Sequence, residues 1–351
     1  MTYNICPFSK TQIDKAGSKL SRPKASHESS DVENAIEIIN SFRAAHNFPL
    51  LILRIVLATR ARKIDATATV AQRLKRLPAI EAKLRRLSSM RLTQMEDIGG
   101  CRAVVRSCRM VRRLCRLYTK SRMKHQRFHI VDYLTKPRDT GYRGIHLIQT
   151  YYSKSKPQYN SLKIEIQLRS RPQHAWATAV ETVDAFTGQG LKDGNGEAQW
   201  QRFFALMGTY IARKDKGNPV PNTPTDWQMV NHEISSLADQ IHVIERLESY
   251  RATLDFEGIR DARFYLLDLD VPKNETRIIG FKEDQFEEAQ EFYVASEKAL
   301  ADEPGRDVVL VSVGSLESLK RAYPNYFADT DVFIGIVREA IMAGQDIDYE
   351  S

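Results

Sequence analysis

Alternating polar and apolar residues mark two segments of the chain as β-strands with one polar face. In Lys163–Arg169 an apolar residue occupies every second position, so a period of two places the polar side chains together on one side. A second run, Arg102–Arg106, is rich in β-forming residues, places its two arginines on one side, and follows Asp97 and two glycines. If the two strands are neighbours, Asp97 and Glu165 can converge on a divalent metal. Carboxylate oxygens and nearby cations are the groups that Mg²⁺ and a polyphosphate require.

Apolar residues at helical spacing predict the elements around these strands. One helix is expected from Asp31, a second after the break at Pro49, and a third from Pro78, because proline suits a first helical turn. Val230–Leu254 has the period of a single long helix. Other helices are expected at 111–118, 172–183, 200–207, 286–300, 316–322 and 331–343, and other strands at 128–134, 264–270, 276–281 and 307–313.

Composition divides the chain into parts. Residues 1–30 are polar and are expected to be poorly ordered. A cluster of Gly, Pro and Asn between Lys214 and Asp226 is the clearest boundary signal. The expected parts are a first domain at 31–212, a linker and long helix at 213–260, and an accessory α/β module at 261–351. We expect this module to sense a regulatory protein partner, to neutralise the first domain, or to form homo-oligomers, because it is acidic where the first domain is basic.

The charge of the chain favours anionic partners. Its 351 residues carry a formal net charge of +8, with basic residues concentrated between Arg54 and Arg127 and acidic ones after Asp255. The four cysteines form no C-x-x-C pair, so we expect reduced cytosolic thiols and no zinc site. The longest apolar run ends before Arg54, and the N-terminus lacks an apolar signal core. These features predict a cytoplasmic protein without membrane spans.

Several side chains near the two strands are candidates for a binding site. Arg73 and Lys75 share a face of an alternating run, and Lys83 lies on the helix that follows, although a solvated basic face would give the same pattern. Tyr142 follows a glycine and could offer a planar face to a nucleobase, whereas a packed aromatic is the commoner role. His174 could reach the site or cap its helix.

Four motifs, in order, resemble the synthetase domain of the RelA/SpoT family, the alarmone synthetases that make (p)ppGpp. Arg73–Lys83 resembles the family's ATP-binding R-x-K-x-x-x-S-x-x-x-K, and Asp97–Arg102 resembles its D-I-x-G-x-R. Asp132–His146 resembles its D-Y-x-x-x-P-K-x-x-G-Y-x-S-x-H, and Glu165–Ser170 resembles its E-I-Q-I-R-T. The resemblance covers roughly residues 35–185.

This resemblance implies an α+β fold, with a nucleotidyltransferase-like mixed β-sheet flanked by helices, here followed by a smaller C-terminal α/β module. The implied reaction is pyrophosphoryl transfer from ATP to the 3′-hydroxyl of GDP or GTP, with Mg²⁺ as cofactor. By matching positions, the resemblance implies Asp97 and Glu165 as the catalytic residues and metal ligands: Asp97 holds Mg²⁺, and Glu165 binds the ion, activates the acceptor hydroxyl, or does both. The residues that the resemblance assigns to ATP are Arg73, Lys75, Lys83 and Arg102, and those it assigns to the acceptor are Arg138, Tyr142, His146, Gln167 and Arg169.

The chain departs from the family pattern at a few positions. Ala79 and Gly144 stand where serines are usual, and Arg138 where a lysine is usual. The segment between His146 and Glu165 is longer than in the family and is expected to form an extended hairpin. The chain has no His-Asp dipeptide, on which the hydrolase half of long family members depends. It therefore resembles a small member of the family that only synthesises the alarmone.

Two other functions remain open from the sequence. Some relatives are toxins that pyrophosphorylate the 3′ end of tRNA, and the basic residues between Arg106 and Arg127 could guide RNA. Alternatively, the chain binds nucleotides or RNA without catalysis. The two replaced serines favour that interpretation, and the presence of both Asp97 and Glu165 opposes it.

Overall fold

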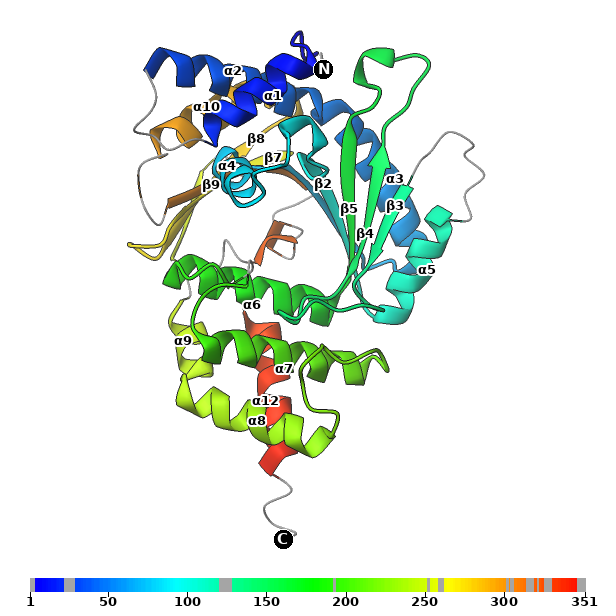
Figure 1. Cartoon of the computed structure of the whole chain (residues 1–351), viewed down its shortest axis with the longest axis vertical. Coiled ribbons are helices and arrows are strands. Elements are labelled where there is room, and N and C mark those ends of the chain that lie inside the picture. Colours follow the sequence, from blue (N-terminus) through cyan, green and yellow to red (C-terminus); the bar gives the residue numbers. More distant parts are fainter. Residues whose placement is uncertain are drawn as a thin grey trace.

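The chain folds as a curved β-sheet with helices on both sides and a further layer of helices beneath it (Figure 1). The structure is a computed structural model, and only the backbone is described for 29–30 and 253–257. The described residues are 4–21, 29–119, 128–191, 194–250, 253–257, 262–300, 303, 306–313, 319–320, 322–324 and 330–345. Among the described helices, none combines the length and the apolar character that a membrane crossing requires.

The described strands form a single mixed sheet of nine strands in the order β3-β4-β5-β2-β1-β9-β7-β8-β6. Near its middle, β2 pairs in parallel with β5 and antiparallel with β1. The strands are β1 (Thr69–Leu74), β2 (Gly99–Val105), β3 (Phe128–Asp132), β4 (Ile145–Thr150), β5 (Lys163–Ser170), β6 (Thr253–Glu257), β7 (Phe264–Asp270), β8 (Glu275–Phe281) and β9 (Arg306–Ser312). This mixed sheet flanked by helices confirms the expected fold class.

Helices cover the sheet and build the layer beneath it (Figure 1). The first four are α1 (Lys10–Leu20), α2 (Ser29–Ala45), α3 (Asn47–Ile64) and, after β1, α4 (Leu77–Arg86). The others are α5 (Cys108–Thr119), α6 (Arg171–Thr187), α7 (Ala198–Lys214), α8 (Trp227–Gln240), α9 (Val243–Ser249), α10 (Phe286–Ala299) and α12 (Asp331–Gln345). Short 3₁₀ turns occur at Leu92–Gln94, Pro157–Tyr159 and Glu283–Gln285.

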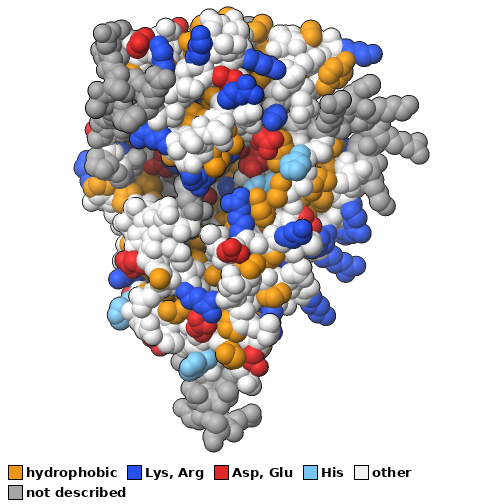
Figure 2. Space-filling model, in the orientation of Figure 1, with side chains coloured by type: hydrophobic (Ala, Val, Ile, Leu, Met, Phe, Trp, Pro, Cys, Tyr) orange, Lys and Arg blue, Asp and Glu red, His pale blue; other side chains and the backbone are white. Residues whose placement is uncertain are grey.

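The two faces of the central strands have opposite characters. One face packs against α3 and α5 in an apolar cluster that includes Leu57, Val111 and Ile166, all fully buried. This is the apolar side of the alternation in β5, and it leaves the polar side chains of β5 on the other face. That other face lies in a hollow of the molecular surface, where acidic, basic and histidine side chains gather (Figure 2).

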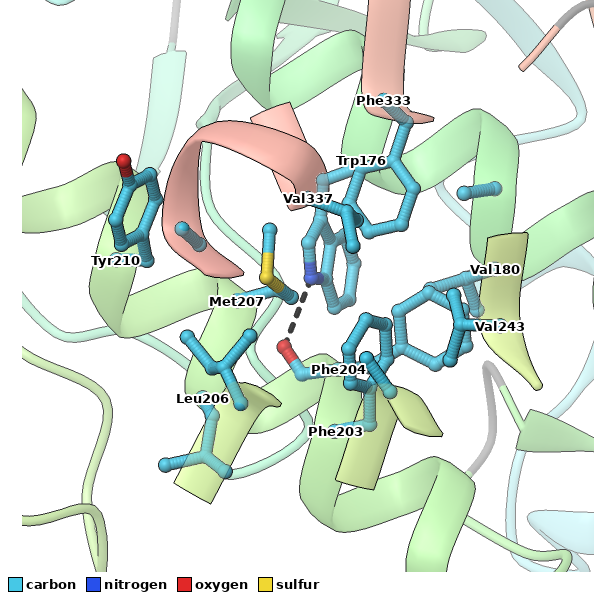
Figure 3. Packing of buried hydrophobic residues seen from close by; sticks show 14 of the residues in the cluster. Trp176, Val180, Phe203, Phe204, Leu206, Met207, Tyr210, Val243, Phe333 and Val337 are labelled. Atoms are coloured by element: carbon cyan, nitrogen blue, oxygen red, sulfur yellow. Dashed lines mark hydrogen bonds between the residues drawn. The ribbon is translucent and has the colours of Figure 1, made fainter. Parts of the chain in front are cut away.

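The helical layer beneath the sheet has its own apolar core (Figure 3). Trp176 of α6 packs edge to face against Phe204 of α7 and donates its indole N–H to the Phe204 carbonyl at 2.9 Å. Phe333 and Val337 of α12 are fully buried in the same cluster, so the C-terminal helix packs back against helices that follow the central strands. Aromatic pairs and large apolar side chains of this kind contribute strongly to core stability.

The C-terminal strands extend the central sheet. β9 pairs antiparallel with β1 through Gln72 opposite Ser312 and Arg73 opposite Val311. On its other edge β9 pairs with β7 over seven residue pairs. The part expected to form an accessory module thus adds three strands, β7, β8 and β9, to the same sheet, and its last helix, α12, belongs to the helical layer.

Two local expectations differ from the structure. Residues 10–20 form α1, because Ser9 caps the helix and Gln12 bonds back to the Ser9 backbone, which satisfies free N–H groups at the helix start. The expected single helix at 230–254 is instead α8, α9 and strand β6, because His242 adopts a left-handed conformation (φ 49°) that interrupts the helical path. The segment expected as a helix at 316–322 lies mostly outside the described residues.

Candidate active site

The strand register places the polar residues of the site in two adjacent rows. In one row Arg73 of β1, Gly100 of β2 and Glu165 of β5 lie side by side. In the next row Arg102 lies beside Gln167, which in turn lies opposite His146 of β4. All of these side chains project from the face opposite α3 and α5, because residues paired directly across strands share a face.

Asp97 lies just before β2 and is held between two lysines. Lys75, at the end of β1, and Lys83, on α4, each place Nζ 2.8 Å from one of its carboxylate oxygens. Burial raises the pKa of Asp97, but the two ammonium charges and their hydrogen bonds outweigh it and bring the pKa to about 2. Asp97 is therefore a carboxylate at neutral pH, surrounded by cations.

Glu165 is held by hydrogen bonds to both of its oxygens. His146 Nδ1 lies 2.9 Å from Oε1, and the Gln167 amide donates to Oε2 at 2.6 Å. Burial raises the pKa of Glu165, but the bond to His146 and the charge on that ring bring it below its ordinary value. The charge of Asp97 opposes this shift, so the two carboxylates are close enough to interact electrostatically.

The hydrogen bonds around Glu165 form a closed ring of five residues. His146 Nε2 lies 2.6 Å from Tyr142 Oη, which also accepts from Arg169 Nε at 3.2 Å. Arg169 Nη2 donates to the Gln167 side-chain oxygen at 3.0 Å, and Gln167 donates to Glu165. Burial lowers the pKa of His146, but Tyr142 and Glu165 outweigh it and raise the pKa to about 9. Each member of the ring is thereby fixed by two others.

Tyr142 is surrounded by aromatic and cationic groups. Its ring makes edge contacts with Tyr133 and Trp176, at centroid distances of 5.5 and 6.2 Å. Arg138 stacks on Tyr133 at 4.7 Å and donates to its hydroxyl at 2.8 Å. Gly141, before Tyr142, has φ of 97° and packs directly on Gly208 of α7. The loop that carries Tyr142 thus packs against the helical layer through this contact.

Most residues of this site lie in a part of the chain that matches a known family. Residues 72–184 match the family model described as "Region found in RelA / SpoT proteins". The chain contains a RelA/SpoT region. It includes Lys75, Lys83, Asp97, Glu165 and the whole ring of bonded residues, whereas α1–α3 and everything after α6 lie outside it.

Solved structures similar to the chain include small alarmone synthetases. Small alarmone synthetase 1 from Bacillus subtilis, bound to its product pppGpp, is 19% identical with a TM-score of 0.42, and covers 50% of this chain and 91% of its own. A GTP pyrophosphokinase family protein from Streptococcus pneumoniae is 19% identical, with the same TM-score, over 50% and 88% of the two chains. Small alarmone synthetase 2 from Bacillus subtilis is 17% identical, with a TM-score of 0.40, over 50% and 92%. No curated protein matches the chain.

Arg102 of the RelA/SpoT region is covered by a segment from the C-terminal part of the chain. The guanidinium donates to the backbone carbonyl of Ala322 and lies over the ring of Tyr323. Tyr323 is 3% exposed, and its hydroxyl donates to the Gln72 carbonyl of β1 at 2.9 Å. Burial, together with the neighbouring charge of Arg169, lowers the pKa of Arg102 to about 10. Arg102 is thus bound to groups from the C-terminal part of the chain, whereas Lys83 is bound to Asp97 within the RelA/SpoT region.

Sequence reasoning missed the residues that come from outside the RelA/SpoT region. Nothing in the sequence around Tyr323 or Gly208 indicates that they contact Arg102 and the Tyr142 loop, because these contacts span large separations along the chain. At α6, the capping residue is Ser170, which bonds reciprocally with Gln173, so His174 is not the cap. His174 is instead a buried residue of α6. The Ser-x-x-Gln pattern at 170–173 is a capping-box signal, and it could have identified Ser170 as the cap from the sequence.

Proposed function

We propose that the chain transfers a pyrophosphoryl group from ATP to the 3′-hydroxyl of GDP or GTP. The observation that supports this most strongly is that two carboxylates, Asp97 just before β2 and Glu165 on β5, are close enough to interact electrostatically, each in a different charged setting. Asp97 accepts hydrogen bonds from two lysines, and Glu165 is hydrogen-bonded to His146 and Gln167. Phosphoryl-type transfer needs mainly alignment and charge neutralisation, and these groups can supply both.

Lys75, Lys83 and Arg73 would bind the triphosphate of ATP. Two lysines carry two positive charges against the single negative charge of Asp97. The excess charge leaves their ammonium groups able to bind phosphate oxygens as well. Arg73 lies in the same row as Glu165, so its guanidinium would lie beside the attacked phosphorus. Arg102 would join them once Tyr323 no longer covers it.

Asp97 and Glu165 would hold Mg²⁺. Both are hard oxygen donors that carry negative charge, which suits this ion, and a polyphosphate and water could complete its six positions. Among the described residues no group of three or more His, Cys, Asp or Glu side chains is arranged to hold a metal ion. In this proposal the two carboxylates are the protein's ligands. When bound, the metal supplies charge neutralisation at the phosphates.

Glu165 would take the proton of the acceptor hydroxyl. The oxygen then attacks the β-phosphorus of ATP, the bond from that phosphorus to the α,β-bridging oxygen breaks, and AMP leaves. Tyr142 and Arg138 would contact the acceptor nucleotide, and Gln167, Arg169 and His146 hold the ring that keeps Glu165 in place. A fixed base needs only moderate basicity when charge neutralisation accompanies the transfer.

The test is incubation of the purified protein with ATP, Mg²⁺ and GDP or GTP, followed by separation of the nucleotides. A 3′-pyrophosphorylated guanosine nucleotide and AMP are expected in equal amounts. Asp97→Asn and Glu165→Gln should each abolish the product without loss of folding. A product unaffected by either change would exclude these roles, and nucleotide binding without any product in the unaltered protein would favour a non-catalytic binding protein.

A second acceptor, the 3′ end of tRNA, is favoured by the surface of α5. Arg109, Arg113 and Arg116 are exposed there, and among the described residues no carboxylate forms an ion pair with them. Arg112 alone has such a partner, Asp132, at 3.5 Å. Lys and Arg side chains gather along the flank where α5 lies (Figure 2). Unpaired arginines on one helix suit a phosphate backbone.

Competition between the acceptors separates the two candidates. ATP labelled in its γ-phosphate is offered together with tRNA and GTP at equal concentrations. Label on GTP alone supports the nucleotide acceptor, and label on tRNA supports the RNA acceptor. In the second case Arg113→Glu should reduce labelling of tRNA, and Lys15→Glu, an exposed change on α1, should leave it unchanged.

A further inference from the structure

Two buried charged residues from outside the RelA/SpoT region form an ion pair next to the backbone of Lys75 and Leu77. Glu297, on α10, and Arg43, on α2, place Oε2 and Nη1 2.8 Å apart, with side chains only 6% and 3% exposed. The Tyr293 hydroxyl donates to Glu297 Oε1 at 2.9 Å and accepts from Arg43 Nη2 at 2.7 Å. Arg43 Nη1 also donates to Asn40 Oδ1 at 2.6 Å, so the two buried charges have polar partners on several sides.

The same two side chains also bond to the backbone where β1 runs into α4. Glu297 Oε1 accepts the N–H of Leu77 at 2.7 Å, and Arg43 Nε donates to the carbonyl of Lys75 at 3.0 Å. The Lys75 N–H donates to the Ile98 carbonyl at 2.8 Å, next to Asp97. The peptide groups on both sides of residue 76 are thus held by elements that lie far from them in the sequence.

Stability alone does not account for this buried pair. Replacing a buried ion pair with well-packed apolar side chains is often neutral or stabilising, so such a pair is weak evidence for stability. A more specific role is visible at α4, whose first residue follows Arg76 without a side-chain cap of its own. The Glu297 carboxylate supplies the missing acceptor and faces the positive end of the helix. Asp307 of β9 pairs with the Arg76 side chain. Together they fix where α4 begins.

We infer that Glu297 is a positioning residue for the ATP side of the proposed site. Lys75 directly follows β1 and Lys83 lies on α4, and each places Nζ 2.8 Å from an Asp97 oxygen. The distance between the two lysine side chains, and the directions in which they point, depend on the backbone between β1 and α4, which Glu297 and Arg43 hold. The identification of the ligand as ATP rests on the proposed function. The hydrogen bond by which Glu297 holds Leu77 is independent of that function.

The test compares Glu297→Gln with a matched control. Glu233 pairs with Arg202 through two bonds of 2.5 and 2.8 Å in the helical layer, with both side chains 34% exposed, so Glu233→Gln removes the charge of a doubly bonded but less buried pair away from the site. Calorimetry gives the affinity of each protein for a non-hydrolysable ATP analogue with Mg²⁺ and for GDP. We expect Glu297→Gln to weaken binding of the analogue about ten-fold and of GDP less than about two-fold, and Glu233→Gln to change neither. Equal losses for both nucleotides would overturn the inference.

Hydrogen exchange of the same proteins without nucleotide tests the structural part separately. Amides at 77–83 should exchange faster in Glu297→Gln than in the unaltered protein or the control. Faster exchange with no binding of the ATP analogue by any protein would leave the positioning role intact and count against the proposed function. Unchanged exchange together with unchanged affinity would exclude the role. If Glu297→Gln does not fold, Glu297→Asp, which keeps the charge but is shorter by one methylene, should give the same changes to a smaller extent.

Discussion

The guanidinium of Arg102 lies 5.4 Å from the ring centre of Tyr323, so a residue assigned to ATP by resemblance is in contact with an aromatic side chain from the C-terminal part of the chain. Ala322 accepts a hydrogen bond from the same guanidinium. Arg102 is half-buried, and the ring and the carbonyl occupy part of its guanidinium, so full contact with a phosphate would require the aromatic residue to move. The contact links the C-terminal part to the triphosphate side of the proposed site.

Tyr323→Ala should therefore strengthen binding of ATP. A desolvated cation–π contact is worth about 1 to 2 kcal/mol, so removing it should raise the affinity for a non-hydrolysable ATP analogue by about 5- to 30-fold. Tyr323→Phe is the control, because it keeps the ring over Arg102 and loses only the bond to the Gln72 carbonyl. Equal affinities for the alanine variant and the unaltered protein would show that Arg102 is not held back by this ring.

Gly208→Ala should damage the loop that carries Tyr142. In an exposed helix interior this change normally stabilises by about 1 kcal/mol, but a Cβ at Gly208 would lie 2.6 Å from the Gly141 carbonyl oxygen. The loop must shift, at a cost of about 1 to 3 kcal/mol, and acceptor binding should weaken while ATP binding is kept. The control is Gly335→Ala in α12, where a Cβ meets nothing within 4 Å and stability should stay the same or rise. Denaturant unfolding and nucleotide titrations would measure both effects.

Stability should fall with acid because of His46. Burial lowers the pKa of His46 to about 4, although the bond from Nδ1 to the Phe42 carbonyl at 2.8 Å partly opposes this. The unfolded chain binds a proton near pH 6.5 and the folded one only near pH 4, so stability is lost as the pH falls between these values. The loss should reach roughly 3 kcal/mol. His46→Asn keeps a donor for Phe42 but does not titrate, so its unfolding free energy should depend less on pH. Parallel curves for the two proteins would contradict this assignment.

Phe333→Ala should destabilise the whole fold. Phe333 is fully buried against Phe203 and Phe204 (Figure 3), and truncating such a side chain costs about 3 to 5 kcal/mol. Met342→Ala on the same helix is the control, because that side chain is 66% exposed and should matter little. If α12 were separable, Phe333→Ala would unfold only the C-terminal part, and thermal unfolding would show two transitions in place of one.

The sequence alone was sufficient for the parts of the site that depend on local pattern. Alternation in Lys163–Arg169 predicted one polar face, and the parallel pairing of Gly100 with Glu165 brings that face next to the residues after Asp97. Helix α4 was predicted from Pro78 because proline favours a first turn. These signals act over a few residues, where backbone geometry and side-chain alternation determine the outcome.

Contacts between distant segments could not be predicted in this way. The pairing of β1 with β9 involves two residue pairs, and neither strand carries a pattern that selects the other. The bond from Glu297 to Leu77 joins residues 220 positions apart, and a glutamate on a helix is usually solvated. The break at His242 was also missed, since the apolar spacing continues through it while the backbone does not. Such features depend on the assembled tertiary structure.

The pairing of β9 with β1 also affects how the protein forms on the ribosome. β1 emerges early, whereas the strand that completes its second edge is translated more than 200 residues later. Until then the amide and carbonyl groups along that edge are open to pairing with other nascent chains. Slow closure of such a distant pair makes newly made molecules vulnerable to aggregation. Cells producing this protein would therefore depend on chaperones that shield the open edge until the final strand arrives.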